Sequence, residues 1–312
     1  MPWQKIVFVL LLLISLSPFG SPPIALALGL AVAFSFGNPF PGLIGKPAKY
    51  LLQASVVLLG FGMNLTAVYN AGRDGLLFTI ATIFGTLILG FFAGRVLGIN
   101  PKSSALISSG TAICGGSAIA AVGPAIGAEA DEMSVSLGTV FILNSIALFV
   151  FPVIGHSVGL SQGQFGIWAA IAIHDTSSVV GAAQAYGSEA MSIATTVKLA
   201  RALWIAPIAL FFAYAFREAG GGGKAKAAMP WFIFVFIAAA AARTFAPSSI
   251  APSIFDALVN LAKAGMTVTL FLIGASLSRR LLKAVGLRPL VQGVFLWVVI
   301  SLVSLLAVLN LA

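Results

Sequence analysis

The feature that most constrains the fold is a succession of apolar stretches that runs from one end of the chain to the other. An α-helix needs roughly 20 apolar residues to cross the hydrocarbon core of a bilayer. Of the 312 residues, 60% are hydrophobic and 8% are charged, whereas a soluble domain has roughly 25% charged residues. Too few polar side chains remain to cover a water-facing surface. The sequence therefore predicts an all-α polytopic membrane protein.

The apolar stretches predict about 11 membrane segments of helical length. These segments are 5–20, 23–38, 48–68, 74–97, 102–127, 132–157, 162–186, 189–216, 229–245, 252–278 and 288–311.

Basic residues set the expected orientation, because Lys and Arg prefer cytoplasmic loops. Four basic loops share one side when the N-terminus is cytoplasmic, and the C-terminus is then external. These loops contain Lys46 and Lys49, Arg95 and Lys102, Arg217, Lys224 and Lys226, and Arg279, Arg280, Lys283 and Arg288. Because the net charge of +9 is scattered over such loops, we do not expect a nucleic-acid partner.

Two segments are interrupted near their centres by short polar runs. The first run is Gly110-Thr111-Ala112-Ile113-Cys114-Gly115-Gly116-Ser117, within 102–127, and the second is His174-Asp175-Thr176-Ser177, within 162–186. Polar groups persist at membrane depth only where protein buries them or a wet cavity receives them. Together the interruptions predict a midplane site for a polar solute.

The first interruption favours a break in the helix, because three of its eight residues are glycines. A new half-helix beginning near Gly115 to Ser117 would point free N–H groups and its positive dipole end at an anion. Close packing of helices through small residues is the alternative interpretation.

In the second interruption, we expect Thr176 or Ser177 to cap the following half-helix. Asp175 needs a partner or water at this depth, and His174 is suited to carrying a proton near neutral pH. The alternative is a polar helix end at the membrane interface.

Lys198 and Arg201 are three residues apart, which places them on one face of a helix. Two cations at depth need an anion, which is either a substrate or Asp175 as a structural ion pair. The planar fork of Arg suits sulfate or carboxylate oxygens. Lys263 is a third cation or the partner of Asp256.

Two weak internal similarities suggest repeats. Residues 58–65 resemble 270–277, and 115–140 resemble 175–197, a match that sets Asn144 opposite Arg201. Every matched pair becomes inverted if each interrupted segment enters and returns as a re-entrant hairpin. We favour this inverted repeat, with spanning broken helices as the alternative.

An enzyme would require Cys114, His174 and Asp175 to act as thiol, base and orienting group. Asp175 is the immediate neighbour of His174, which is poor geometry on a helix. One Cys, one His and one Asp are also too few for a metal site. We therefore expect no enzyme activity, no catalytic residue, no metal and no cofactor.

The run Thr111 to Ile119, together with His174 to Ala182, resembles the YeiH-like family of membrane proteins, which carries a sulfate exporter label. Lys198, Arg201 and the segment 270–280 fit this resemblance, which covers nearly the whole chain. The family is similar in turn to the sodium/proton antiporters and bile-acid symporters. That similarity implies inverted repeats, a panel domain, and a core domain whose interrupted helices cross near the midplane. We expect the protein to lie in a prokaryotic cytoplasmic (inner) membrane.

These observations predict a single integral membrane transporter domain, 1–312, with its core around 102–216 and the other helices as panel, scaffold and repeat partners. We expect a secondary active exporter of a small anion such as sulfate, sulfite or a sulfonate, coupled to H⁺ or Na⁺ and capable of forming a homodimer. A passive anion channel and a sodium-coupled organic-anion symporter are the alternatives. The expected substrate-binding residues are Cys114, Gly115, Gly116, Ser117, Thr176, Ser177, Ser178, Lys198 and Arg201. The expected ion-coupling residues are His174, Asp175, Asn144 and Lys263.

Overall fold

The computed structural model describes residues 2–17, 21–40, 46–62, 65, 76–216, 231–246, 252–277 and 285–310, and the regular structure in them is helical. The basic loop residues Arg217, Lys224, Lys226, Arg279, Arg280 and Lys283 lie outside the described residues.

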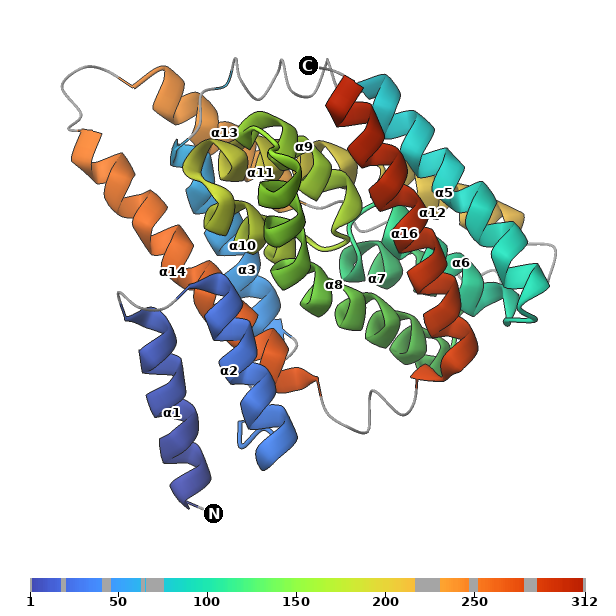
Figure 1. Cartoon of the computed structure of the whole chain (residues 1–312), viewed down its shortest axis with the longest axis horizontal. Helices are drawn as coiled ribbons and strands as arrows, with labels where there is room; N and C mark the ends of the chain where they lie inside the picture. The colour runs from blue at the N-terminus through green and yellow to red at the C-terminus, as the bar shows by residue number, and fades with distance from the viewer. Residues whose placement is uncertain are drawn as a thin grey trace.

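One group of helices, here called the outer group, lies on the left in Figure 1. It consists of α1 (Pro2–Leu16), α2 (Pro22–Ser35), α3 (Lys46–Leu59) with the 3₁₀ turn η2 (Gly60–Gly62), α13 (Trp231–Thr244) and α14 (Pro252–Ser276). Helices α2 and α14 cross at two glycines. A Cβ atom on Gly29 would lie 2.2 Å from the Phe271 carbonyl oxygen, and one on Gly274 would lie 2.4 Å from that of Leu26. Small residues allow this backbone contact, as is common in membrane helices.

The second group, here called the inner group, fills the centre and right of Figure 1. Its longer helices are α5 (Leu76–Val96), α8 (Ala130–Val158), α11 (Ser188–Ala202), α12 (Ile205–Ala215) and α16 (Leu287–Asn310). They pack around two pairs of short helices, α6 (Pro101–Ala112) with α7 (Gly116–Ala125) and α9 (Gln162–Ala172) with α10 (Thr176–Tyr186). Contact with the outer group runs mainly through α10, which packs on α2 and α14. The expected core, 102–216, is thus joined by α5 and α16.

Each pair of short helices folds back on itself. In the first pair, Lys102 Nζ at the start of α6 donates a 2.7 Å hydrogen bond to the carbonyl of Gly127, just beyond the end of α7. In the second, Tyr186 Oη donates a 2.6 Å bond to the carbonyl of Leu160, just before α9. The two interrupted segments are therefore helical hairpins, here called hairpin 1 (101–125) and hairpin 2 (162–186). This geometry favours re-entrant hairpins over spanning broken helices, and the path of the two segments through a membrane stays a prediction.

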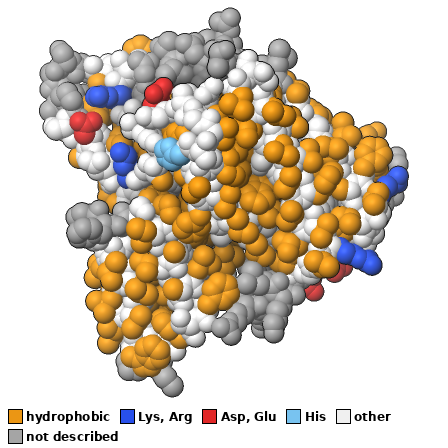
Figure 2. Space-filling view, in the orientation of Figure 1, with side chains coloured by type: hydrophobic (Ala, Val, Ile, Leu, Met, Phe, Trp, Pro, Cys, Tyr) orange, Lys and Arg blue, Asp and Glu red, His pale blue; other side chains and the backbone are white. Residues whose placement is uncertain are grey.

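The surface agrees with a membrane environment. Hydrophobic side chains cover most of the face shown in Figure 2, and its charged side chains gather near two opposite margins. Within the described residues, five helical runs are long and apolar enough to cross a membrane. They are Phe78–Val96, Asp131–Val158, Ser188–Ala215, Ser253–Ser276 and Leu287–Asn310. The chain is a membrane protein, and the larger number of segments expected from the sequence stays a prediction.

Candidate functional site

The tips of the two hairpins meet inside the inner group. A Cβ atom added to Gly115, in the turn of hairpin 1, would lie 3.2 Å from Cβ of Asp175, in the turn of hairpin 2. Gly115 also has a φ of +66°, a conformation that glycine adopts without steric cost. The break that the glycines predict is therefore present, and α7 begins at Gly116.

Arg201 binds the tip of hairpin 1. Its side chain is fully buried, and its Nη2 donates to the carbonyl of Ala112, the last residue of α6. Its Nη1 donates a 2.8 Å hydrogen bond to Oγ1 of Thr82 on α5. The guanidinium thus lies at a helix C-terminus, where the partial negative charge of the helix dipole favours a cation.

Lys198 binds the tip of hairpin 2 in the same way. Its buried Nζ donates to the carbonyls of Ile173, at 2.8 Å, and Ala170, at 3.2 Å, at the C-terminal end of α9. The two cations of α11 therefore each neutralise the carbonyl end of one hairpin's first helix. A buried charge without such partners would be costly.

The local sequence of α11 and α12 explains where these cations lie. The three-residue spacing of Lys198 and Arg201 places both on the buried face of α11. Two residues after Arg201 the helix is interrupted, and α12 starts at Ile205. Pro207 has no N–H with which to bond the preceding turn, which accounts for the interruption.

Asp175 caps α10. Its Oδ1 accepts from the Ser178 backbone N–H at 2.8 Å and from the Ser177 hydroxyl, and its Oδ2 accepts from the Ser178 hydroxyl at 2.8 Å. The expectation that Thr176 or Ser177 supplies the cap is wrong, because Asp175 has the extended backbone of an N-cap residue (φ −99°, ψ 157°). The alternative of an ion pair between Asp175 and Lys198 or Arg201 is also wrong, since both cations contact carbonyls and a hydroxyl instead.

Asn144 on α8 supports hairpin 2 as Arg201 on α11 supports hairpin 1. Its Oδ1 accepts a 3.0 Å hydrogen bond from the backbone N–H of His174. These are the two positions that the internal sequence match sets opposite each other. Each places a polar side chain against the turn of one hairpin.

Several buried polar atoms around the tips have no hydrogen-bond partner among the described residues. They are Thr111 Oγ1, Asn144 Nδ2, both ring nitrogens of His174, and Arg201 Nε. Buried polar groups in proteins are normally hydrogen-bonded. Asn144 Nδ2 and Arg201 Nε can only donate, the Thr111 hydroxyl can donate, and a neutral imidazole donates from one nitrogen. The tips thus present an excess of donors, which an oxyanion would satisfy.

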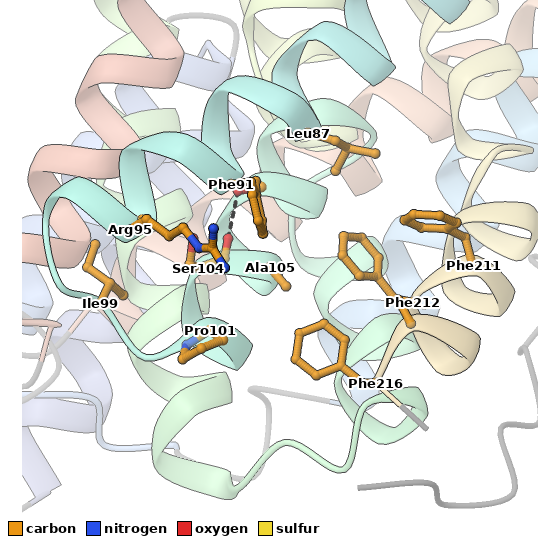
Figure 3. Close-up of a pocket in the computed structure, with 13 residues that line it drawn as sticks. Leu87, Phe91, Arg95, Ile99, Pro101, Ser104, Ala105, Phe211, Phe212 and Phe216 are labelled. Atoms are coloured by element: carbon orange, nitrogen blue, oxygen red, sulfur yellow. Dashed lines mark hydrogen bonds between the residues drawn. The ribbon is translucent and has the colours of Figure 1, made fainter. Parts of the chain in front are cut away.

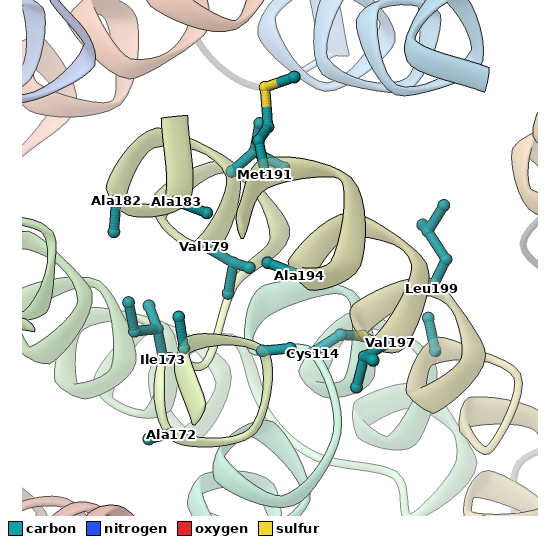
Figure 4. Close-up of a cluster of buried hydrophobic side chains, with 14 of the residues drawn as sticks. Cys114, Ala172, Ile173, Val179, Ala182, Ala183, Met191, Ala194, Val197 and Leu199 are labelled. Atoms are coloured by element: carbon teal, nitrogen blue, oxygen red, sulfur yellow. The ribbon is translucent and has the colours of Figure 1, made fainter. Parts of the chain in front are cut away.

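The start of α7 is open by comparison with that of α10. No side chain caps it, Gly116 is half-buried, and Ser117 is exposed. Cys114 is buried and lies close to the backbone of Ala118 and to Ser117. Figure 4 shows it within an apolar cluster to which hairpin 2 and α11 contribute, for example through Val179 and Val197. Because neither nitrogen of His174 is hydrogen-bonded, Cys114 and His174 form no thiol–imidazole pair.

Most of the residues expected to form the site come together. The tips and the helices that bind them bring together Cys114, Gly115, Asn144, His174, Asp175, Lys198 and Arg201. Lys263 does not join them, since it lies half-buried on α14 in the outer group. Sequence reasoning missed Thr82. The one available signal was a row of threonines on α5, at positions 79, 82 and 86, all of which are buried.

The comparisons with known proteins place the chain among bacterial membrane proteins. The profile of the family described as Conserved hypothetical protein 698 matches residues 5–293. A UPF0324 membrane protein of Porphyromonas gingivalis is 52% identical over 97% of this chain and 94% of its own length. One from Bacteroides thetaiotaomicron is 53% identical over 93% and 86%, and one from Geobacter sulfurreducens is 47% identical over 96% and 94%. No solved structure matches the chain. The chain therefore belongs to the YeiH-like family of bacterial membrane proteins, the family of Conserved hypothetical protein 698.

Proposed function

We propose that the protein is a secondary active transporter that exports a small anion such as sulfate, sulfite or a sulfonate across the cytoplasmic membrane. The observation that carries this proposal is the set of buried, unpartnered donors at the hairpin tips, from Thr111, Asn144, His174 and Arg201. Oxyanions accept several hydrogen bonds at once, and those from charged donors are the strongest.

Local charge supports an anion over a cation. The tips hold two buried cations, Lys198 and Arg201, and one carboxylate, Asp175. Both oxygens of Asp175 already accept hydrogen bonds from Ser177 and Ser178. Among the described residues, the site thus carries one positive charge in excess and offers no free carboxylate to a cation. The uncapped start of α7 adds backbone donors and a positive helix end on the same hairpin.

The division into two groups of helices suggests how access would alternate. Hairpins 1 and 2 and their supporting helices form a unit that contacts the outer group mainly through α10. In this proposal the inner group moves as a core against the outer group as a panel, which exposes the tips to each side in turn. In this proposal the two hairpins are inverted with respect to each other, which is supported by α8, between them, because α8 is long and apolar enough to span the membrane.

We assign coupling to a proton or a sodium ion. His174 is the candidate proton carrier, because both of its ring nitrogens are buried and free of hydrogen bonds. Asp175 is less suited to this role, because its oxygens are committed to the cap of α10.

The test is counterflow in proteoliposomes loaded with sulfate, sulfite or taurine, at several pH values and with or without sodium. A carrier accelerates uptake of labelled anion when unlabelled anion is present inside. Conductance of the anion without such exchange would overturn the carrier and support the passive channel instead. Arg201→Gln is expected to abolish exchange. Arg243→Gln, on α13 in the outer group, is the control, because it also removes one positive charge but lies away from the hairpin tips.

A further inference from the structure

A cavity lies away from the hairpin tips, between α5, α6 and α12. Its volume is about 370 Å³, which is within the range of roughly 300–1,000 Å³ typical of ligand pockets. One wall is aromatic, with Phe211 and Phe212 of α12 and Phe216 directly after it, and the opposite wall carries Phe91 and Arg95 of α5 (Figure 3). Phe91 and Phe211 are both more than half exposed, so the cavity opens on the apolar surface of the inner group.

The polar groups at the floor of this cavity are already hydrogen-bonded within the protein. Ser104 donates to the carbonyl of Gly90, Ser108 donates to the carbonyl of Ser104, and both hydroxyls accept from Nε2 of Gln292. The floor thus offers little to a small polar solute, because a ligand that loses its water there gains few hydrogen bonds in return. The remaining lining is mostly apolar, which suits a hydrocarbon chain.

Arg95 places a positive charge at the rim. It lies in the last turn of α5, it is exposed, and its guanidinium carbon is 4.7 Å from the centre of the Phe91 ring. Stacking holds the planar group beside the cavity and leaves its N–H groups free for phosphate oxygens, which Arg binds in a bidentate manner. Among the described residues that line it, the cavity therefore combines an apolar interior with one cation, Arg95, at its mouth.

We propose that this cavity binds an anionic phospholipid, with the lipid phosphate on Arg95 and one acyl chain between Phe91 and the phenylalanines of α12. Basic pockets between membrane helices recognise anionic headgroups in this way. The proposal is independent of the transported anion, because its residues do not include the hairpin tips.

The matched control is Arg288 at the start of α16. Its guanidinium passes near Gly98, in the turn between α5 and α6, and it does not line the cavity. Arg95→Gln and Arg288→Gln therefore remove the same charge from the same end of the inner group. Ala215 is exposed and lines the mouth of the cavity. Ala215→Trp therefore tests separately whether an acyl chain enters the cavity.

The experiment measures the melting temperature of delipidated protein in detergent. Phosphatidylglycerol, phosphatidylcholine with the same chains, glycerol phosphate and inorganic phosphate are added separately. We expect phosphatidylglycerol to raise the melting temperature more than phosphatidylcholine, because a bound ligand stabilises the folded state. Arg95→Gln removes that difference, Arg288→Gln keeps it, and Ala215→Trp weakens the response to both lipids. Equal behaviour of the two Arg variants, or equal stabilisation by free phosphate, would overturn the proposal. Mass-spectrometric mapping of a photoactivatable phosphatidylglycerol gives an independent readout, with labelling expected in 211–216.

Discussion

The ammonium of Lys102 and the carbonyl of Gly127 lie 2.7 Å apart in a hydrogen bond that joins the two ends of hairpin 1. Twenty-five residues separate them in the chain, and a single helix of that length would place its ends on opposite sides of a membrane. The bond therefore holds α6 and α7 together as a hairpin. Tyr186 and Leu160 join the ends of hairpin 2 in the same manner.

This geometry makes a prediction about topology. Asn100→Cys and Ala128→Cys, at the two ends of hairpin 1, should react with a membrane-impermeant maleimide from the same side. Ser161→Cys and Ser188→Cys should both react from the other side, because α8, between the hairpins, is long and apolar enough to cross a membrane. Cys114 is the single cysteine and is buried, so Cys114→Ala supplies a cysteine-free background. Labelling of Asn100→Cys and Ala128→Cys from opposite sides would rule out the hairpin.

The link between Arg201 and Thr82 should be measurable as stability. Thr82→Val keeps the shape of the side chain and removes the acceptor of Arg201 Nη1. We expect a loss of about 1.5–3 kcal/mol in the free energy of unfolding, the range for hydrogen bonds to charged groups. Thr86→Val is the control, because its hydroxyl bonds only within its own helix. Equal effects of the two substitutions would argue against a tie between α5 and α11.

Two substitutions of Asp175, the cap of α10, distinguish the effect of the side chain's shape from the effect of its charge. Asparagine is about as good an N-cap as aspartate, whereas alanine costs about 0.5–2 kcal/mol. Asp175→Asn should therefore keep both stability and anion binding, and Asp175→Ala should lower the thermal stability. If Asp175→Asn instead changes the sodium or pH dependence of transport at unchanged stability, the carboxylate takes part in coupling.

The crossing of α2 and α14 gives a pair of glycine predictions. Gly29→Ala forces a Cβ atom against the carbonyl of Phe271, and overpacking of this kind costs about 1–3 kcal/mol. Gly85→Ala, within α5, meets nothing within 4 Å and should stabilise the protein by about 0.5–1 kcal/mol, because alanine favours the helix. Unfolding in graded detergent mixtures compares the two, and a neutral Gly29→Ala would contradict the backbone contact.

Much of the architecture was accessible from the sequence, because apolar length and glycine-rich breaks report directly on helices in a membrane. The interruptions at 110–117 and 174–177 lie at the turns of the two hairpins. The helical spacing of Lys198 and Arg201 correctly placed both on one face.

The hydrogen-bond partners of those two cations could not be predicted from the sequence. Lys198 and Arg201 bind backbone carbonyls at helix ends. Because every residue has a backbone carbonyl, the sequence does not indicate which ones accept these hydrogen bonds. The Arg201–Thr82 bond joins residues 119 positions apart, which no local pattern reveals. The sequence predicts the cap of α10 one or two residues too late, because Asp, Thr and Ser all occur there and only the backbone conformation chooses among them.

The most direct measurement of the central claim uses Thr111, whose buried hydroxyl has no partner in the described part of the chain. Thr111→Val keeps the shape and breaks no hydrogen bond of the protein, so the fold should be as stable as before. If the tips bind an anion, its dissociation constant, measured by calorimetry with sulfate or sulfite, should rise about 5-fold to 10-fold, since one hydrogen bond contributes about 1 kcal/mol. Ser109→Ala, on the same helix with a hydroxyl bonded locally to Leu106, should leave the dissociation constant unchanged. Equal anion affinity in the wild type and Thr111→Val would contradict an anion site at the hairpin tips.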